Sequence, residues 1–241
     1  MSNFVDPKEL LAAGAHFGHK TSRWHPLMAP YIHSVKNNIH IIDLVKTASL
    51  LEIAVDFVEK IASEGKPVML VGTKRQAASI IKAKAEEVGA PYVTERWLGG
   101  MLTNHTTMSG RIKHLKKLEE QMENGELASR YNKLEVQRFQ EEIDKLNQMF
   151  GGIKTMVGLP GAIVVVDTNN EKIAIKEARR LNIPVVGIAD TNSDPSVLDY
   201  VVPANDDAIK TLQLLMDTFG KAITSGKAKT KKTEETKEGE K

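Results

Sequence analysis

The sequence predicts an α/β protein in which a parallel sheet is flanked by helices and is interrupted by an inserted antiparallel coiled-coil helical hairpin. Two observations support this prediction. Short apolar runs alternate with longer amphipathic segments in the first and last parts of the 241-residue chain, a pattern typical of a parallel sheet covered on both faces. Between these parts, residues 104–152 have the three- and four-residue apolar spacing of helices with charged flanks.

The elements of the α/β part follow from their caps and their apolar periodicity. A first helix is predicted to follow the N-cap Asp6 and to end near Ala13, with Pro7 in its first turn and Glu9 three residues after the cap. The later elements, in chain order, are expected as a strand at Ile39–Leu44, a helix at Ala48–Ser63, a strand at Val68–Val71, a helix at Arg75–Val88, a strand at Tyr92–Val93, a strand at Ala162–Val166, a helix at Asn170–Leu181, strands at Val185–Ile188 and Tyr200–Val202, and a helix at Asp206–Ile223.

The inserted hairpin is predicted from two apolar seams that run toward each other. The seam residues are Met108, Ile112, Leu115, Leu118 and Met122 on the way out and Leu127, Tyr131, Leu134, Phe139, Ile143, Leu146 and Phe150 on the way back. A turn is expected at Glu123–Glu126, and Gly151-Gly152 should end the second helix. We therefore expect residues 1–103 and 153–224 to form one globular domain and residues 104–152 to protrude from it.

The end of the chain, residues 225–241, is rich in Lys, Glu and Thr and has no bulky apolar residue. A segment of this composition cannot bury enough apolar surface to offset its ordering entropy. A disordered tail is therefore expected here.

The segment from Gly14 to Thr47 is the most unusual part of the sequence. It contains five histidines, Arg23, Trp24, two prolines and an Asn-Asn pair, and up to Asn38 it shows neither a helical nor a strand period. A long aperiodic loop is expected, and loops that carry such residues are usually functional surfaces. Cations, flat rings and amides together suit RNA.

Composition excludes several classes of function. The chain has no cysteine, so disulfides, thiolate metal sites and cysteine nucleophiles are excluded. No apolar run approaches the ~20 residues needed to span a bilayer. The first residues resemble a capped helix and not a basic and apolar leader. The expected location is therefore cytoplasmic, and no membrane partner is expected.

The net charge of +2 conceals a division along the chain. Residues 66–117 carry a charge of +7, and residues 118–217 carry −7. Such an asymmetry favours one face for a polyanion and another for solvent or a protein partner, although solvated faces with a random imbalance would give the same numbers.

Gly72-Thr73-Lys74-Arg75-Gln76 follows a buried strand and opens a helix. Thr73 and Gln76 are placed to form a capping box, while the amides, the helix dipole and two cations also suit a phosphate. Helix capping, an RNA phosphate contact and a bound nucleotide all remain open. The GxxxxGK[ST] and GxGxxG patterns of nucleotide-binding loops are absent.

Two acidic loops, Asp167–Glu171 and Asp190–Asp194, follow predicted strands, where open α/β sheets place ligands. Capping and loop rigidity, with Thr168 and Glu171 as a second capping box, compete there with a Mg²⁺ site and with acid–base catalysis. Asn205-Asp206-Asp207 is expected to cap the last helix. His16, His19 and His25 match no strong zinc pattern, and no nucleophile elbow or Ser-His-Asp order occurs. No catalytic residue, metal site or cofactor is assigned.

The segment Arg96–Asn104 joins the predicted sheet to the hairpin, with Trp97 expected to be buried beneath Gly99-Gly100. Cations gather around it, and we expect them to form one continuous phosphate-binding surface with the segment near Lys20. Charge and position select the candidate RNA-binding residues Lys20, Arg23, Trp24, Lys36, Asn37, Lys74, Arg75, Arg96, Asn104, Arg111, Lys113 and Lys117.

Several stretches together resemble the bacterial small-subunit ribosomal protein S2 family. They are GAHFGHKTSRWHPLMAPYI, NNIHIIDLVKT, VGTKRQA, RWLGGMLTN, and the long run that begins GGIKTMVGLPGAIVVVDTNN and ends DYVVPANDDAI, and they keep the family order from about Leu10 to Ile223. The resemblance implies a flavodoxin-like (Rossmann-like) sheet with a coiled-coil arm and no enzymatic activity. It further implies a structural constituent of the 30S subunit that binds 16S rRNA between head and body on the solvent side, beside neighbouring small-subunit proteins, and helps to hold ribosomal protein S1.

Two other classes of function remain as hypotheses. The fold class alone permits a nucleotide- or sugar-phosphate-binding enzyme, with its ligand at the carboxyl edge of the sheet. The chain is also a candidate adaptor that acts mainly through the hairpin.

Overall fold

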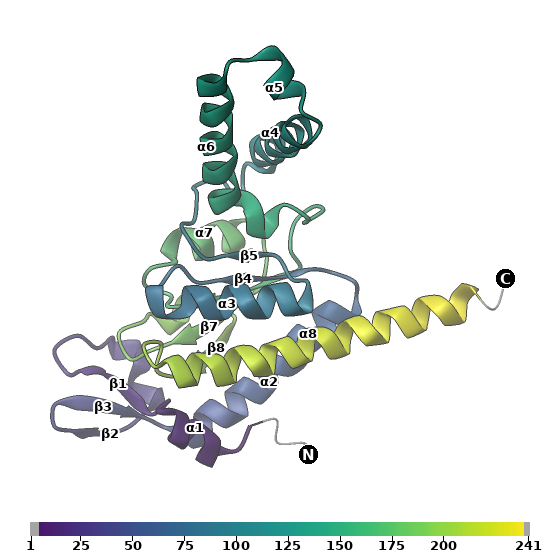
Figure 1. Cartoon of the computed structure of the whole chain (residues 1–241). Helices are drawn as coiled ribbons and strands as arrows, with labels where there is room; N and C mark the ends of the chain where they lie inside the picture. The colour runs from purple at the N-terminus through teal and green to yellow at the C-terminus, as the bar shows by residue number, and fades with distance from the viewer. Residues whose placement is uncertain (1–4, 239–241) are drawn as a thin grey trace.

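The computed structural model describes residues 5–238, and its centre is a five-stranded parallel sheet, the main sheet (Figure 1). The strand order is β5-β4-β6-β7-β8. The strands are β4 (Val68–Val71), β5 (Tyr92–Val93), β6 (Ala162–Val166), β7 (Val185–Ala189) and β8 (Tyr200–Pro203). All residues of β4, β6 and β7 are buried, which is why the sequence shows continuous apolar runs there instead of an alternation. The predicted α/β class is confirmed.

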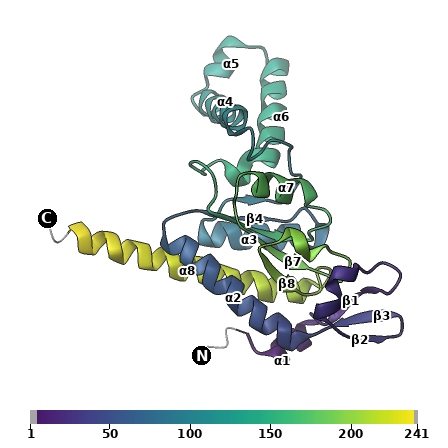
Figure 2. The same cartoon turned by 180° about the vertical axis from the view of Figure 1, so that it is seen from behind.

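Helices cover both faces of the main sheet. On one face lie α1 (Pro7–Ala13), α2 (Leu44–Ser63), α3 (Arg75–Val88) and α8 (Ile209–Glu238), and α7 (Lys172–Arg180) lies on the other. Figures 1 and 2 show α2 and α8 crossing beside each other along the first face. Along β6, Val164 packs with the α2, α3 and α8 layer, and its neighbours Ile163 and Val165 pack with α7. The two cores therefore lie on opposite sides of one sheet.

Two helices begin several residues away from their predicted start, and local caps explain the difference. Helix α2 begins at Leu44 because the Asp43 carboxylate accepts hydrogen bonds from the amides of Val45 and Lys46. Helix α8 begins at Ile209, after a turn in which Asn205 Oδ1 accepts from two following amides. The expected cap at Asn205–Asp207 is thus present, ahead of the first helical turn.

The prediction of a long loop from Gly14 to Asn38 is wrong. This segment contains β1 (Phe17–Lys20), the 3₁₀ helix η1 (Pro26–Tyr31) and β2 (Ile32–Lys36), and β1 and β2 flank β3 (Ile39–Ile42). They form an antiparallel three-stranded sheet in the order β1-β3-β2, the small sheet. Register shifts in both pairings and the exposure of β2 hide the strand period.

The Asn-Asn pair is a second local signal of this sheet, beside the strand predicted at Ile39–Leu44, which forms β3 and ends at Ile42. Asn37 and Asn38 have φ values of 52° and 59°, and they connect the paired residues Lys36 and Ile39. A two-residue connection with positive φ at both positions is the tight hairpin turn that suits the twist of antiparallel strands.

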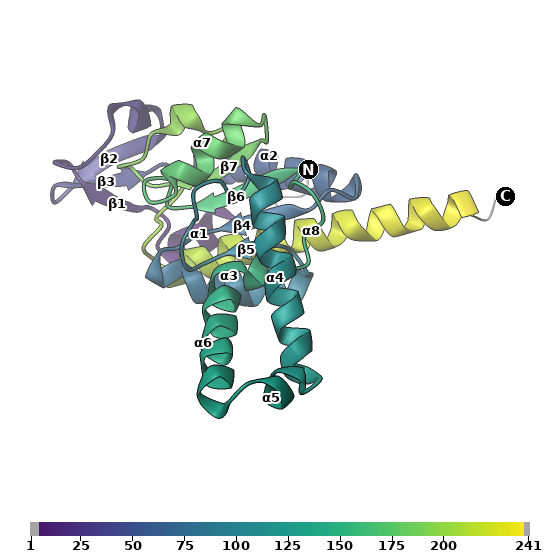
Figure 3. The ribbon, with the colours of Figure 1, turned by 90° about the horizontal axis from the view of Figure 1, so that it is seen from above.

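The inserted segment consists of α4 (His105–Glu123), α5 (Glu126–Arg130) and α6 (Lys133–Phe150), which we call the arm. Figure 3 shows α4 and α6 extending away from the main sheet, with α5 joining their far ends. The expected simple turn is replaced by α5, and α6 then starts at a capping box made by Asn132 and Glu135. The seam residues Leu115, Leu118 and Ile143 are buried. The coiled-coil character of this pair stays a prediction.

The prediction of a disordered tail from residue 225 is also wrong, because α8 continues to Glu238. Thr230 Oγ1 lies 3.1 Å from the Ala62 carbonyl oxygen and 2.9 Å from that of Ser63, and Lys227 Nζ lies 2.7 Å from the carbonyl oxygen of Val88. Polar side chains of α8 thus bind the carbonyl groups left open at the ends of α2 and α3, and no apolar residue is needed. The last residues, 239–241, lie outside the described part.

A glycine permits this contact between α8 and α2. A Cβ atom on Gly226 would lie 2.5 Å from the Glu59 carbonyl oxygen and 2.6 Å from the Ala62 Cβ atom. The two helices approach too closely there for any side chain. Within residues 5–238, every helix is too short or too polar to span a bilayer.

Candidate nucleic-acid interface

The small sheet is fixed to the main sheet through Thr191, the second residue after β7. The backbone amide of His19 donates to Thr191 Oγ1 at 2.8 Å, and the amide of His25 donates to the Thr191 carbonyl oxygen at 2.8 Å. Gly18 permits the approach, since a Cβ atom there would lie 2.5 Å from Thr191 Cγ2. The small sheet is therefore a rigid extension of the carboxyl edge of the main sheet.

The small sheet and its loops present one group of the predicted RNA-binding residues. The exposed members of this group are Lys20, Arg23, Trp24, Lys36 and Asn37. No Asp or Glu occurs between Gly14 and Ile42. The segment itself thus supplies cations and no carboxylate, which suits a phosphate-binding surface, and the aspartates that approach it, Asp190 and Asp207, do so at His19.

A second group of cations lies where the arm leaves the globular body, a region we call the arm base (residues 96–117). Its exposed predicted members are Arg96, Asn104, Arg111, Lys113 and Lys117. Asn104 is the residue before α4 and accepts a hydrogen bond from the Thr107 hydroxyl at 2.9 Å. The arm base thus offers a cluster of solvated cations on the first turns of a helix and on the loop before it.

A buried carboxylate that sequence reasoning missed organises the loop of the arm base. Glu177 on α7 accepts hydrogen bonds from Trp97 Nε1 at 3.2 Å and from the backbone amides of Gly100, Leu102 and Thr103 at 2.7, 3.0 and 3.1 Å. The Thr103 hydroxyl donates to the same carboxylate. Trp97 is 6% exposed, as expected. The signal was available, because Glu177 shares a helical face with the apolar Ala174 and Ala178.

The carboxylate of Glu177 stays ionised because of these donors. Burial alone would raise its pKa, but the hydrogen bonds from Gly100, Thr103 and Leu102 outweigh that effect and lower the pKa below its usual value. The loop therefore winds around a fixed negative charge, which leaves Arg96 on the outside.

The expected single continuous surface does not form. The arm base follows β5 at one edge of the main sheet, while the small sheet lies beside the loops after β7 and β8 near the other edge. Two edges of a five-stranded sheet lie about 19 Å apart. Figures 1 and 2 show the small sheet and the arm at different ends of the body. The chain thus carries two separate cationic patches.

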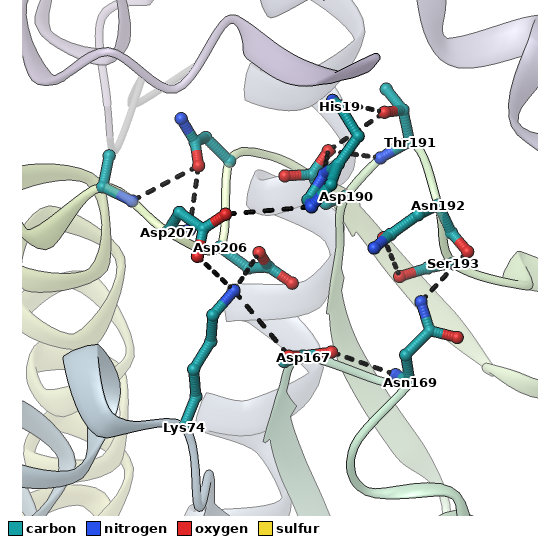
Figure 4. Close-up of polar contacts among 12 residues, drawn as sticks. His19, Lys74, Asp167, Asn169, Asp190, Thr191, Asn192, Ser193, Asp206 and Asp207 are labelled. Carbon is teal, nitrogen blue, oxygen red and sulfur yellow. Dashed lines mark hydrogen bonds and ion pairs between the residues drawn. The ribbon is translucent and has the colours of Figure 1, made fainter. Parts of the chain in front are cut away.

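Lys74 does not belong to either patch. Its ammonium nitrogen lies 2.7 Å from Asp206 Oδ1, 2.6 Å from Asp207 Oδ1 and 3.7 Å from Asp167 Oδ2 (Figure 4). Burial by itself lowers the pKa of the Lys74 ammonium, but the hydrogen bonds to Asp206 and Asp207 raise it well above its usual value. Lys74 is a neutralising charge inside the protein, and we remove it from the candidate phosphate contacts. Its neighbour Arg75 is exposed.

His19 extends this network to the small sheet. Its Nδ1 atom lies 3.1 Å from Asp190 Oδ1, and its Nε2 atom lies 3.8 Å from Asp207 Oδ2 (Figure 4). The hydrogen bond with Asp190 raises the pKa of His19 above its usual value although burial opposes it. Burial, together with the charge of Asp190, raises the pKa of Asp206 to about 7. We call His19, Lys74, Asp167, Asp190, Asp206 and Asp207 the sheet-edge network.

At Gly72–Gln76, one of the places considered for a phosphate, a side chain of the protein itself occupies the amide of Thr73. Glu171 Oε1 accepts from the Thr73 amide at 2.8 Å and from the Thr73 hydroxyl at 2.6 Å. The expected Thr73–Gln76 capping box is therefore wrong, since Lys74 is the N-cap residue of α3 and makes no side-chain cap hydrogen bond. The expected capping box of Thr168 with Glu171 is also wrong, because the Glu171 carboxylate binds Thr73 and α7 begins without a side-chain cap. In the loop after β6, Asp167 Oδ1 instead accepts hydrogen bonds from the backbone amides of Asn169 and Asn170, which rigidifies that loop.

The histidines near the start do not converge on a metal site. Among the residues that the structure describes, no group of three or more His, Asp or Glu side chains is arranged to hold a metal ion. His25 instead caps η1, through its Nδ1 atom and the Leu27 amide at 3.3 Å.

Comparison with known proteins places these features in a family. Residues 10–226 match the family model described as Ribosomal protein S2. The chain is 48% identical over 223 residues to the small ribosomal subunit protein uS2 of Rippkaea orientalis (strain PCC 8801 / RF-1), covering 92% of this chain and 83% of the relative. It is also 48% identical over 223 residues to the protein of the same name from Picosynechococcus sp. (strain ATCC 27264 / PCC 7002 / PR-6), covering 87% of that relative. The chain therefore belongs to the ribosomal protein S2 family.

Proposed function

We propose that this protein is a structural constituent of the small (30S) ribosomal subunit that binds 16S rRNA between the head and the body on the solvent side. The observation that carries the proposal is the match to uS2 proteins over 92% of the chain, which includes both cationic patches. As a member of a family of ribosomal proteins, the chain is not an enzyme. Its place is with ribosomes in the cytoplasm.

Two separate patches suit a large folded RNA better than a small ligand. A polyanion with phosphates on several helices contacts surfaces that face different directions, and each patch then fixes one RNA segment. The rigid connection of the small sheet through Thr191 and of the arm base through Glu177 holds the patches at a constant separation. The protein would thereby stabilise the relative position of two rRNA segments.

The proposed phosphate and base contacts are the exposed predicted residues. They are Lys20, Arg23, Trp24, Lys36, Asn37, Arg75, Arg96, Asn104, Arg111, Lys113 and Lys117. The arm carries acidic residues such as Glu120 and Glu123 farther from its base, and these are exposed. We assign this outer part to protein neighbours in the subunit. We also propose, from the resemblance to the family, that the protein helps to hold ribosomal protein S1.

The alternative of a nucleotide- or sugar-phosphate-binding enzyme loses its support at the sheet edge. The position where such a ligand would bind holds the Lys74 ammonium, and the amide of Thr73 that would face a phosphate donates to Glu171. Nucleotides with Mg²⁺ should therefore leave the melting temperature of the protein unchanged, whereas a tight site would raise it.

The test is the assembly of 30S particles from 16S rRNA and small-subunit proteins with this protein supplied separately. Neutralising Arg96, Arg111 and Lys113 together should lower its occupancy and make the remaining binding less dependent on salt. The matched control neutralises Lys145, Lys176 and Lys221, which lie outside both patches. Equal occupancy of both triple variants and of the original protein at elevated salt would contradict the proposed interface.

A further inference from the structure

The outer face of the small sheet combines an aromatic ring, an aliphatic centre and two lysines. Residues directly opposite each other in an antiparallel pair share a face of the sheet. Phe17 and Ser34 both pair with Ile41, and Lys20 and Lys36 both pair with Ile39. Two parallel rows of three residues result, Phe17–Ile41–Ser34 and Lys20–Ile39–Lys36. Residues 39 and 41 are two apart on one strand, so both rows lie on the same face.

The two faces of the small sheet differ in cover along its central strand β3, although Val35 on the inner face of the edge strand β2 is 52% exposed. On the inner face, His40 is 6% exposed and Ile42 1% exposed, and the Trp24 ring lies over the His40 ring at 5.0 Å between centroids. On the outer face Phe17 is 50% exposed, and both lysines are exposed. The Phe17 ring contacts the His16 ring at 4.0 Å between centroids, and its remaining exposed half is a surface that a flat ligand can cover.

Charge complementarity selects the kind of ligand. The face carries cations at both outer strands, and the chain has no carboxylate from residue 14 to residue 42. Asp190 and Asp207, which approach this part of the chain, are engaged with His19. An aromatic ring beside cations on a sheet is how single-stranded nucleic acids are bound, through base stacking and phosphate contacts.

We propose that this face binds an unpaired stretch of RNA, with one base stacked on Phe17 and the adjoining phosphates held by Lys20 and Lys36. The two rows are about 7 Å apart, twice the rise of a strand residue, so a base on the first row leaves its phosphate near the second. The bases of a paired A-form helix are already stacked and do not reach such a face. The inference rests on the proposed function and adds that the small sheet recognises single-stranded rRNA.

The test compares Phe17→Ala with Phe17→Tyr in the full chain. The probe is a short, fluorescently labelled, adenine-rich RNA, used alone and annealed to its complement, with binding followed by anisotropy. Loss of the ring should weaken binding of the single strand about tenfold, and the tyrosine variant should retain it. The duplex should bind both variants and the original protein alike. Lys20→Ala and Lys36→Ala should each lower the salt dependence of single-strand binding, which Phe17→Ala should leave unchanged.

The matched control is Val157→Ala, because Val157 is 91% exposed on a loop far from the small sheet in the sequence. It should bind the single strand like the original protein. Equal affinity of Phe17→Ala and Val157→Ala for the single strand would overturn the inference, as would an equal loss on single strand and duplex. A third outcome would also overturn the inference. If Phe17→Ala no longer joins 30S particles but binds RNA with unchanged affinity, the outer face of the small sheet contacts a protein. If the original protein fails to join 30S particles, the proposed function fails separately.

Discussion

Lys20 and Lys74 have the same chemistry, and both are near the carboxyl edge of the main sheet, but their surroundings differ completely. Lys20 is exposed on a part of the chain without carboxylates, while the Lys74 ammonium lies within 4 Å of three of them. The sequence predicted both as phosphate contacts. The comparison shows that a lysine is available to an external polyanion only where the fold supplies no internal partner, and three aspartates from distant loops decide this for Lys74.

The largest expected effect comes from removing Lys74. Lys74→Met leaves Asp167, Asp206 and Asp207 close together without a counter-charge, and breaking a buried ion network of this kind costs about 3–5 kcal/mol of unfolding free energy. Lys20→Met should cost less than about 0.5 kcal/mol, because it is a surface substitution. Urea unfolding of both variants measures the difference. Equal stability of the two variants would remove the distinction between the two lysines.

Glu177 sharpens the comparison, since it is a buried charge that faces hydrogen-bond donors instead of a counter-ion. Glu177→Gln keeps the shape of the side chain but leaves only one acceptor oxygen, and its new NH₂ group faces the amide donors of the loop. We therefore expect a loss of about 2–3 kcal/mol of unfolding free energy. The pKa of Glu177 is lowered in the folded protein, so its contribution is present above the unfolded pKa and is lost as the pH falls through the folded pKa. The variant should therefore lose less stability than the original protein on acidification. Stability measured by urea unfolding at several acidic pH values tests this.

A smaller effect is expected from the pH dependence of the sheet-edge network. The pKa of Asp206 is raised to about 7, so the folded protein binds a proton more tightly than the unfolded chain does, and stability declines as the pH rises from the unfolded pKa toward about 7. His19, whose pKa is also raised, adds a loss of the same sign as the pH rises through its folded pKa. Asp206→Asn should flatten this decline and also reduce the part that belongs to His19, because the charge of Asp206 helps to raise the pKa of His19. A variant as pH-dependent as the original protein between about pH 4 and 7 would contradict the assignment.

The parallel strands could be predicted almost residue by residue because both of their faces are buried. Strand β6 and helix α3 have the predicted bounds, Ala162–Val166 and Arg75–Val88. A strand that is buried on both faces appears in the sequence as a continuous apolar run, and a helix that is buried on one face appears as an apolar stripe of helical spacing. The helical spacing also predicted the helices α4 and α6 of the arm, but the predicted seam residue Leu134 is 61% exposed.

The small sheet and the end of α8 could not be predicted in this way. Strand β2 is exposed along most of its length, and its register shifts remove the alternation that marks a strand. The contacts of Thr230 with carbonyl groups of α2 join residues about 170 positions apart and depend on the tertiary fold. For the proposed site, residue type selects candidate cations, but only the folded arrangement separates exposed Lys20 from engaged Lys74.

The most direct test of the account is sedimentation of this protein in a gradient of cell lysate, for the original chain and for a variant with both patches neutralised at Lys20, Lys36, Arg96, Arg111 and Lys113. We predict that the original protein migrates with the 30S particles and that the variant, equally stable in urea, stays at the top of the gradient. Comigration of the variant with the particles to the same extent would contradict an interface built on the exposed cations.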